Sequence, residues 1–342
     1  MLFSFLIPVY CTEKYLDKCM ASLLIQKGAA FEILLLDDGS TDSSGALCDR
    51  YAAQYPEIVR VIHKENEGSF LTRRRGFQEA RGDWFICVDS DDYVAPTLLE
   101  TIVQTLKAHD GCDMVMFNYQ YVDDQGVFSA SRLSIPDGTV FTGAEKQQLY
   151  KARLTSTLVN TMWMRAVHRD IVDISADYTG CGIRGMCDDA LQVLPLYTNS
   201  KKTVFIDRPL YYYRKGDSSI TSRTTMSHWQ AIHRSFVLEQ PYVQLWNVPE
   251  TVSRMRYTRQ MENICNCVRW LYANEAGSDL PGLIRRVKEE SMFEACLKHY
   301  APKYAASRYS AVSISIISRA LARNAYRLLG YFFKLENWLR SR

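Results

Sequence analysis

The sequence predicts an α/β protein in which a central, mostly parallel sheet is flanked by helices, followed by a helical C-terminal region. Within residues 1–120, short apolar runs alternate with helix-like stretches, which is the pattern of stacked βαβ units. From residue 226 onward the pattern is mostly helical, with one break at Gly277–Gly282. We therefore expect two domains, one over residues 1–225 and one over residues 226–342.

Each element of the first domain has its own signal. Strands buried on both faces are expected at Phe3–Val9, Phe31–Leu36, Val59–Ile62, Trp84–Val88 and Asp113–Asn118. Helices are expected near residues 13–26, 42–54, 69–80 and 96–108. Between residues 121 and 215 the pattern loosens into hairpin-like pieces. Three polar loops that follow strands, residues 10–13, 37–42 and 89–92, should meet at the carboxyl edge of the sheet, where open α/β sheets bind ligands.

The composition indicates a globular protein kept in the cytosol. Of 342 residues, 47% are hydrophobic and the formal net charge is +3, which excludes disordered and fibrous classes. No apolar stretch approaches the ~20 residues of a membrane-spanning helix, and residues 1–9 lack the basic start of a signal peptide. The ten cysteines are scattered without a C-x-x-C pair, so we expect reduced thiols and no structural zinc.

The C-terminal tail differs from the rest of the chain in its charge. Residues 301–342 hold eight basic side chains and one acid, so this segment is +7 and the remainder −4. We expect a last, amphipathic helix within residues 310–342 that lies on an anionic membrane surface. Packing of its apolar face on the catalytic domain, or on a second copy in a homodimer, is the alternative. Nucleic acid is not an expected partner, because the positive charge is confined to this segment.

The expected faces of this helix are defined by residue type. The apolar face holds Ile314, Ile317, Leu321, Leu328, Phe332, Leu335 and Leu339, and the basic face holds Arg319, Arg323, Arg327 and Lys334. Aromatic side chains suited to a membrane interface are Tyr326, Tyr331 and Trp338.

Two acidic runs follow strands of the predicted sheet. The first, Asp37-Asp38-Gly39-Ser40-Thr41-Asp42, either makes a turn and a helix cap or places Asp38 to accept hydrogen bonds from a base or ribose. The second, Asp89-Ser90-Asp91-Asp92, gathers three carboxylates whose repulsion a divalent cation such as Mg²⁺ or Mn²⁺ would relieve. A solvated acidic turn is the alternative interpretation of the second run.

A third run places Arg73, Arg74 and Arg75 early in a helix, after the flexible stretch Asn66-Glu67-Gly68. The planar, permanently charged guanidinium suits phosphate recognition. At helical spacing the three side chains point in different directions, so at most one or two face the strand-end site. The others would be ordinary exposed charges.

These runs, in this order, closely resemble the family 2 inverting glycosyltransferases of the GT-A fold, which has a Rossmann-like sheet. The family pattern reads P-x-[YF]-N, D-D-G-S-T-D, N-x-G-x-x-x-A-R-N-x-G and A-x-G-x-Y-I-x-F-L-D-S-D-D. This chain follows it at Pro8–Cys11, Asp37–Asp42, Asn66–Gly76 and Ala80–Asp92, and the resemblance covers about residues 1–225. Departures that remove no carboxylate are Cys11 for Asn, Thr72 and Arg74 within A-R-N, and Val88 for Leu.

The resemblance implies roles for individual residues. Asp89 and Asp91 would be the family's D-x-D pair, with Asp89 near the ribose or the waters of the metal, Asp91 as the direct ligand of Mn²⁺ or Mg²⁺, and Asp92 in support. Such a metal would stabilise charge on the departing nucleoside diphosphate. The residues expected to help hold the nucleotide are Pro8, Tyr10, Glu13, Asp38 and Arg73.

An inverting transfer also needs a base opposite the leaving group. The resemblance assigns this role to Asp189, and Asp188, where the family usually has Glu, would support it or contact the acceptor. Capping of a helix N-terminus is the alternative role for this pair.

The residues after this pair repeat a family ending, Tyr211-Tyr212-Tyr213-Arg214 and then Ser219-Ile220-Thr221. Resemblance and charge suggest that Arg214 reaches the diphosphate when the loop of residues 215–225 closes, with a surface arginine as the alternative. Trp163 either borders the acceptor pocket or packs in the core. The stretch Gly180–Gly185 matches G-x-G-x-x-G but follows no buried strand, so no nicotinamide or flavin site is expected.

The resemblance therefore implies a metal-dependent, hexosyltransferase-type enzyme of bacterial surface-polysaccharide synthesis. It would move a sugar from a nucleotide-sugar donor, expected to be UDP-linked, to a hydroxyl of a lipid-linked or polysaccharide acceptor. We expect it in the cytoplasm, peripheral on the inner face of the cell membrane. A nucleotidyltransferase, which would release pyrophosphate, and a non-catalytic nucleotide-sugar-binding subunit, which would tolerate loss of Asp189, are the alternatives.

Overall fold

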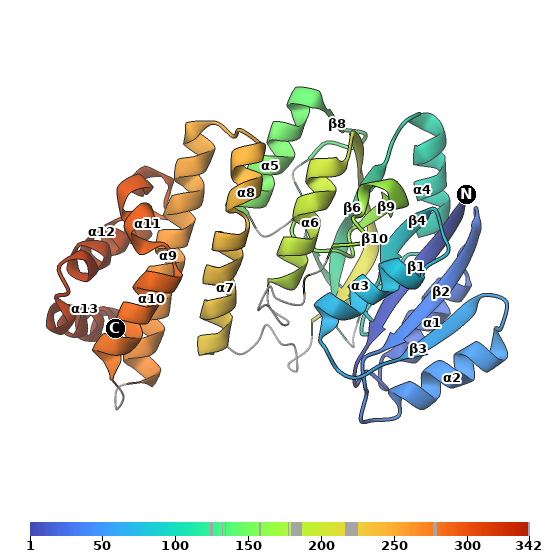
Figure 1. Cartoon of the computed structure of the whole chain (residues 1–342), viewed down its shortest axis with the longest axis horizontal. Helices are drawn as coiled ribbons and strands as arrows, with labels where there is room; N and C mark the ends of the chain where they lie inside the picture. The colour runs from blue at the N-terminus through green and yellow to red at the C-terminus, as the bar shows by residue number, and fades with distance from the viewer. Residues whose placement is uncertain are drawn as a thin grey trace. The chain divides into compact units, whose positions relative to one another are not determined.

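A computed structural model describes residues 1–123, 126–131, 133, 135–156, 159–176, 178, 187–215, 225–275 and 279–340. The chain divides into two compact units (Figure 1). The first comprises Met1–Tyr150 with Thr157–Ser222, and the second Lys151–Ser156 with Arg223–Arg342. Sheet and flanking helices make up the first unit, whereas the described part of the second is helical.

The first unit begins with a parallel sheet that the sequence predicts well. Its strands run in the spatial order β3-β2-β1-β4, with bounds β1 (Leu2–Val9), β2 (Ala30–Asp37), β3 (Val59–His63) and β4 (Trp84–Cys87). The connecting helices are α1 (Leu16–Leu24), α2 (Ser44–Gln54) and α3 (Ser69–Glu79). Helix α3 packs so closely on the sheet that a Cβ on Gly76 would lie 2.8 Å from Cδ1 of Leu36. The interiors of β1, β2 and β4 are buried because helices cover both faces, whereas β3, at the edge of the sheet, is only partly buried, contrary to the expectation for Val59–Ile62.

Beyond β4 the sheet becomes mixed. Strand β9 (Arg165–His168) runs antiparallel to both β4 and β6 (Met114–Asp123), and β6 pairs in parallel with β10 (Lys202–Arg214). The short strands are β5 (Tyr93–Val94), β7 (Gly126–Ser131) and β8 (Val140–Thr142), and the helices are α4 (Leu98–Ala108), α5 (Lys146–Thr155) and α6 (Asp188–Asn199). Around Pro209 the register of β10 against β6 shifts, because proline has no N–H to donate.

Helix α9 (Glu250–Asn274) is the centre of the helical unit. Its buried side chains, among them Met261, Ile264 and Leu271, form a core with the surrounding helices. The other helices are α7 (Met226–Leu238), α8 (Gln240–Leu245), α10 (Leu280–Glu290), α11 (Phe293–His299), α12 (Arg308–Ala322) and α13 (Tyr326–Arg340). No helix in the described ranges is long and apolar enough to cross a bilayer.

The expectation of one last amphipathic helix is wrong, because the tail forms two helices. Helix α12 ends in a Schellman motif: Asn324 has φ 51°, its N–H donates to the Leu321 carbonyl, and the Ala325 N–H donates to the Ala320 carbonyl. Asparagine tolerates this left-handed backbone better than most residues. The turn divides the expected basic amphipathic helix at residues 323–325.

The expected apolar face of the tail is also divided. Ile314, Ile317 and Leu321 are buried in the core around α9, so they pack within the helical unit itself and not on the catalytic domain, as the alternative expected. Leu328 and Leu335 are more than half exposed. The side chains of residues 337–342, which include Trp338 and Leu339, lie outside the described part of the chain.

Candidate active site

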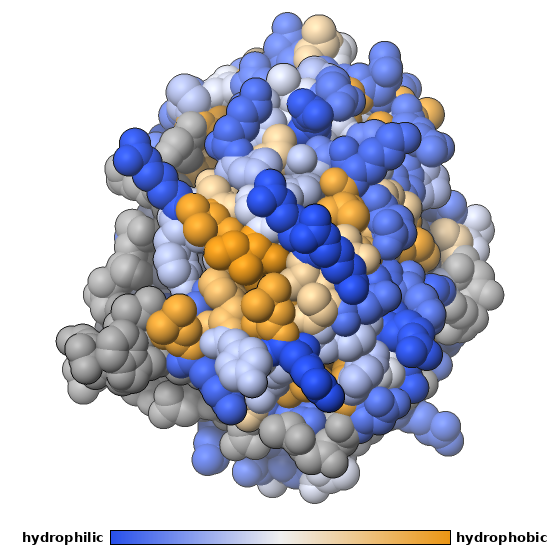
Figure 2. Space-filling model, turned by 90° about the vertical axis from the view of Figure 1, so that its left-hand side faces the viewer, coloured by the Kyte–Doolittle hydropathy of each residue, from blue (hydrophilic) through white to orange (hydrophobic). Residues whose placement is uncertain are grey.

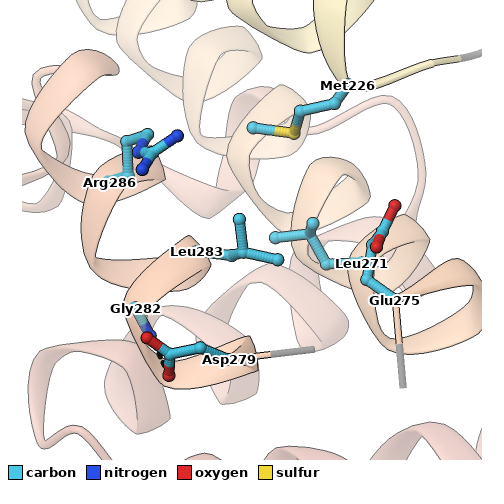
Figure 3. Close-up of a pocket in the computed structure, with 7 residues that line it drawn as sticks. All are labelled: Met226, Leu271, Glu275, Asp279, Gly282, Leu283 and Arg286. Carbon is cyan, nitrogen blue, oxygen red and sulfur yellow. Dashed lines mark hydrogen bonds between the residues drawn. The ribbon is translucent and has the colours of Figure 1, made fainter. Parts of the chain in front are cut away.

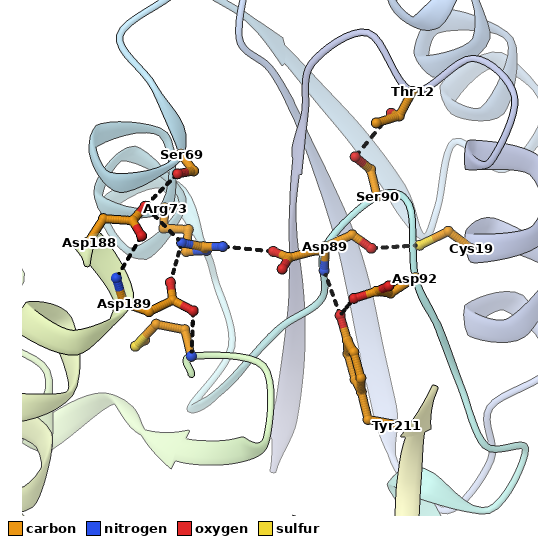
Figure 4. A network of polar contacts seen from close by, with 11 residues as sticks. Thr12, Cys19, Ser69, Arg73, Asp89, Ser90, Asp92, Asp188, Asp189 and Tyr211 are labelled. Atoms are coloured by element: carbon orange, nitrogen blue, oxygen red, sulfur yellow. Dashed lines mark hydrogen bonds and ion pairs between the residues drawn. The ribbon is translucent and has the colours of Figure 1, made fainter. Parts of the chain in front are cut away.

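Arg73 on α3 joins carboxylates from two distant parts of the chain (Figure 4). Its guanidinium nitrogens lie 2.7 Å from Oδ1 of Asp89, 2.6 Å from Oδ1 of Asp189 and 3.4 Å from Oδ2 of Asp188. The side chain is 5% exposed. Burial alone would lower the pKa of Arg73, but the charges of these three acids raise it well above its usual value. One cation thus holds the strand-end acids and the expected base in a single network.

Asp188 and Asp189 occupy the first turn of α6, where N–H groups without helical partners and the helix dipole favour carboxylates. Oδ1 of Asp188 accepts from the Asp189 N–H at 2.7 Å, and its other oxygen accepts from the Ser69 hydroxyl. Oδ2 of Asp189 accepts from the Met162 N–H at 3.1 Å. Both side chains are therefore fixed in orientation toward Arg73, rather than serving only as helix caps.

Asp189 has the titration behaviour expected of a general base. Burial, with contributions from the Asp188 and Asp89 charges, raises its pKa to about 7, although Arg73 acts in the opposite direction. The main physical reason is desolvation of the buried carboxylate, to which the charges of the two neighbouring acids add. A carboxylate that titrates near neutral pH is well suited to accept a proton from a hydroxyl group.

The acidic run after β4 is held by side chains from other strands and loops. The Tyr211 hydroxyl on β10 donates to Oδ2 of Asp92 at 2.7 Å and accepts from the Asp89 N–H at 3.1 Å. Ser90 accepts a hydrogen bond from the Thr12 hydroxyl at 3.0 Å. Burial and the charges of Asp91 and Asp89 raise the pKa of Asp92 well above its usual value. The run is thus a built structure and not a solvated turn.

Asp91 is the acid of this run that is open to a ligand. Its side chain reaches solvent, and within the described part of the chain its carboxylate forms no hydrogen bond or ion pair with another residue. Partial desolvation and the Asp89 charge raise its pKa to about 6. Within the described ranges, no group of three or more His, Cys, Asp or Glu side chains could hold a metal ion. The Asp91 carboxylate therefore suits Mg²⁺ or Mn²⁺ only when substrate phosphates and water supply the remaining ligands of the ion.

Asp38 lies beside the expected nucleotide site, but its carboxylate is occupied by protein donors. Lys64 Nζ lies 2.5 Å from Oδ1, the Glu67 N–H donates to the same oxygen at 3.0 Å, and the Gly68 N–H donates to Oδ2 at 2.9 Å. The side chain is buried. Asp38 thus ties the entry to α3 to the end of β2. Gly39 accommodates the turn, with φ 71° and the Asn66 N only 3.1 Å from where a Cβ would be.

The loop after β1 presents the first group of expected nucleotide contacts. Tyr10 is exposed and Pro8 is half-buried, so both can contact a ligand at the sheet edge. The Glu13 carboxylate accepts from the Ser43 N–H at 2.9 Å, at the start of α2. Cys11 has φ 52°, a backbone that asparagine, the usual residue of the resembled family, adopts more readily than cysteine.

Arg214 lies at this edge, whereas Trp163 is part of the core. The side-chain Nε of Arg214 donates to the Asp91 carbonyl at 3.0 Å, and the backbone N–H of Arg214 donates to Oδ1 of Asp92 at 2.7 Å. Trp163 is 4% exposed and stacks on Tyr211 with ring centroids 4.4 Å apart, so core packing accounts for it. The stretches Gly180–Gly185 and Ser219–Thr221, for which the sequence analysis makes predictions, lie outside the described residues.

Several residues of the site were not predicted from the sequence. Ser69 and Lys64 carry no motif signal, because their partners Asp188 and Asp38 are distant in the chain or across a turn. Tyr211 had a signal in the three consecutive tyrosines at the end of β10, but only the fold reveals its contact with Asp92. Arg74 binds the carbonyls of Asp173 and Ala176 and so does not face the acids.

The helical unit contains a separate hollow of about 350 Å³ (Figure 3). Apolar side chains lie at its centre and acids and an arginine at its edge. None of the expected site residues lines it. The lining residues are Met226, Leu271, Glu275, Asp279, Gly282, Leu283 and Arg286.

Comparison with known proteins adds sequence and fold relationships. A sequence model described as "Glycosyl transferase family 2" matches residues 4–173. The glycosyltransferase GlyG of Streptococcus pneumoniae is 30% identical over 230 residues, which are 64% of this chain and 72% of GlyG.

Two solved structures have a similar fold. Residues 1–349 of S. aureus TarS, in complex with UDP-GlcNAc, give a TM-score of 0.60 at 17% identity, covering 95% of this chain and 92% of that one. The mannosyltransferase PcManGT of Pyrobaculum calidifontis, in complex with GDP-Man and Mn²⁺, gives 0.50 at 13% identity, covering 93% and 86%.

Proposed function

Because the chain belongs to glycosyl transferase family 2 and has the GT-A fold, we propose that it transfers a sugar with inversion from a UDP-linked donor to a hydroxyl of a glycan or lipid-linked glycan. The chain is a glycosyltransferase, and the predicted family and fold are confirmed. The observation that supports the proposed inverting transfer is the contact of Arg73 with both Asp89 and Asp189. It supports a donor side and an acceptor side that meet at one buried guanidinium.

The proposed donor site lies at the carboxyl edge of β1, β2 and β4. Exposed Tyr10 offers its ring to a base, and Pro8 lines the same edge. Glu13 and Asp38 would act through the loops that they hold, since their carboxylates already accept protein N–H groups. Arg214 stays a proposed contact of the diphosphate, because it lies beside Asp91. A direct contact of Arg73 with the nucleotide is a prediction that its present ion pairs do not favour.

A divalent metal, Mn²⁺ or Mg²⁺, belongs to the proposal as a cofactor. Asp91 would hold it directly and Asp89 through water, which is supported by the unpaired Asp91 carboxylate and by the raised pKa of that group. The presence of Mn²⁺ in the complex of the structurally similar mannosyltransferase with GDP-Man is consistent with this choice. When bound, the metal would supply positive charge to the departing diphosphate.

Asp189 is the proposed general base. The acceptor oxygen would bond to the anomeric carbon as the bond from that carbon to the diphosphate oxygen breaks. The acceptor proton would pass to a carboxylate oxygen of Asp189. Asp188, held by Ser69 and by the Asp189 N–H, would fix the base or contact the acceptor. Inversion follows when the base and leaving group lie on opposite faces of the sugar.

The acceptor and the cellular location complete the proposal. A lipid-linked or polysaccharide acceptor would place the enzyme in bacterial polysaccharide synthesis, on the cytoplasmic face of the cell membrane. Support comes from the basic C-terminal tail and from a chain in which no described helix spans a bilayer. A homodimer is the other assembly that the exposed tail would allow.

The proposal is tested by a screen of nucleotide sugars for release of the nucleoside diphosphate, with Asp189→Asn as the comparison. We expect slow release from one UDP-sugar, faster release with a hydroxyl acceptor, and a large loss in Asp189→Asn with UDP affinity retained. Release of pyrophosphate from an NTP would instead indicate nucleotidyl transfer. Unchanged function in Asp189→Asn would indicate a non-catalytic binding subunit.

A further inference from the structure

Helices α12 and α13 expose apolar side chains in the same spacing. In each helix three residues at i, i+3 and i+7 face solvent, and they are between 38% and 73% exposed. This spacing places each set on one side of its helix. Figure 2 shows hydrophobic side chains gathered on this side of the molecule with hydrophilic ones around them. We call the surface the outer face; its apolar residues are Tyr309, Val312, Ile316, Leu328, Tyr331 and Leu335.

The outer face is not the apolar face that the sequence suggests. Ile314, Ile317 and Leu321 point into the core around α9 and fix the orientation of α12. Leu329 and Phe333 do the same for α13. The outer-face residues therefore lie opposite a packed side, and moving them inward would require both helices to rotate.

The same two helices carry unneutralised positive charge beside the apolar residues. Five exposed cations lie along them, and in the described part of the chain none forms an ion pair. Each apolar set is immediately preceded by an arginine, Arg308 before Tyr309 and Arg327 before Leu328. The five cations are Arg308, Arg319, Arg323, Arg327 and Lys334.

The acid of these helices does not offset this charge at the surface. Glu336 is buried, accepts from Arg269 Nε at 3.0 Å, and accepts from the Ser313 hydroxyl at 3.0 Å. Although burial raises its pKa, these partners and Tyr309 lower it overall, so Glu336 is ionised and neutralised by Arg269 inside the unit. The outer face thus presents cations and apolar groups together.

We infer that the outer face of α12 and α13 docks on an anionic lipid bilayer, with its six apolar residues in the interface and its five cations at the lipid phosphates. Fifteen-residue helices are too short to span a bilayer but can lie along its surface. A second copy is a poorer occupant, because two-fold pairing would set the same cations against each other. The inference specifies the membrane placement in the proposed function and is independent of the transferase chemistry.

The test is co-sedimentation of the full chain with vesicles of phosphatidylcholine, alone or with added phosphatidylglycerol. We expect binding to the anionic vesicles only, weakened by salt. Joint replacement of Arg319, Arg323 and Arg327 by Gln should weaken binding about a hundredfold. Leu328→Ser with Leu335→Ser should also weaken it. The matched controls, exposed residues of the same unit outside the outer face, are Leu245→Ser on α8 and Arg285→Gln on α10, which should bind as the unmodified chain does.

Four results would overturn the inference. The first two are no binding of the unmodified chain to anionic vesicles, and binding to neutral vesicles that is as tight as binding to anionic ones. The third is a control variant that loses as much vesicle binding as the outer-face variants do. The fourth is outer-face variants that change the oligomeric state in light scattering without changing vesicle binding. UDP affinity, measured on the same variants, separates the two proposals. Lost vesicle binding with intact UDP affinity bears only on the outer face, and absent UDP affinity in a chain that binds vesicles bears only on the transferase site.

Discussion

Replacement of Arg73 by Gln removes the cation that three carboxylates share. Asp89, Asp188 and Asp189 would then face one another without compensation in a buried site. Breaking a buried ion pair from one side costs about 3–5 kcal/mol of unfolding free energy. For a unit of this size that corresponds to a melting temperature lower by about 6–20 °C.

Arg75→Gln is the matched control on the same helix. Arg75 is 51% exposed and pairs with Glu79 at 2.7 Å across one helical turn. Such a surface pair contributes about 0.3–0.5 kcal/mol, so this variant should melt within about 2 °C of the unmodified protein. Thermal unfolding of both variants, followed by circular dichroism, gives the comparison.

The substitution should also change the pH dependence of catalysis. The charge of Arg73 lowers the pKa of Asp189, whereas burial raises it, and the balance places this pKa at about 7. Without that charge the base holds its proton to higher pH, so the rising limb of kcat/KM should move in the alkaline direction. Arg73→Lys should give a smaller shift, because one ammonium group cannot donate to Asp89 and Asp189 in the way a guanidinium does.

The assay is diphosphate release from the donor across a pH series, and Arg73→Lys serves if the Gln variant does not fold. The reasoning is refuted if Arg73→Gln melts like Arg75→Gln. It is also refuted if both Arg73 variants keep the unmodified pH profile while losing activity.

Three further substitutions test other contacts of the site. Asp189→Asn should lower kcat by about 10²–10⁴ while UDP affinity, measured by calorimetry, stays constant, and an equal loss of affinity would contradict its role as a base. Tyr211→Phe removes one hydrogen-bond partner from the buried Asp92 carboxylate and one from the partly buried Asp89 N–H. Urea titration should therefore show that the unfolding free energy falls by ~1–3 kcal/mol, against little change in Tyr212→Phe. Asp38→Ala removes the acceptor of the residue 67 and 68 N–H groups, so their hydrogen exchange should become faster; unchanged exchange would mean that Asp38 does not hold this loop.

The parallel half of the sheet could be predicted because local signals and the fold agree there. Apolar runs that end in acids mark β2 and β4, and the actual strands end at Asp37 and just before Asp89. Strand β9 gave no comparable signal, since its four residues Arg165–His168 include polar ones at both ends. Their burial comes from pairing with β4 and β6, which one segment of sequence cannot reveal.

Within the site, helical spacing limits how many arginines face the acids but does not select among them. The direction in which α3 packs on the sheet makes the selection: Arg73 faces the acids, Arg74 binds carbonyls and Arg75 points to solvent. In the tail, the apolar spacing continues through Asn324, so the pattern alone reads as one helix. The backbone of that residue, and not hydropathy, separates α12 from α13.

The most direct test of the proposed function is the calorimetric binding of UDP with and without Mn²⁺, for the unmodified chain and for Asp91→Asn. The account predicts affinity that requires both the metal and Asp91, because Asp91 is the unpaired carboxylate of the strand-end run. UDP binding that is absent, or that is the same without metal and in Asp91→Asn, would contradict a metal-dependent UDP-sugar site.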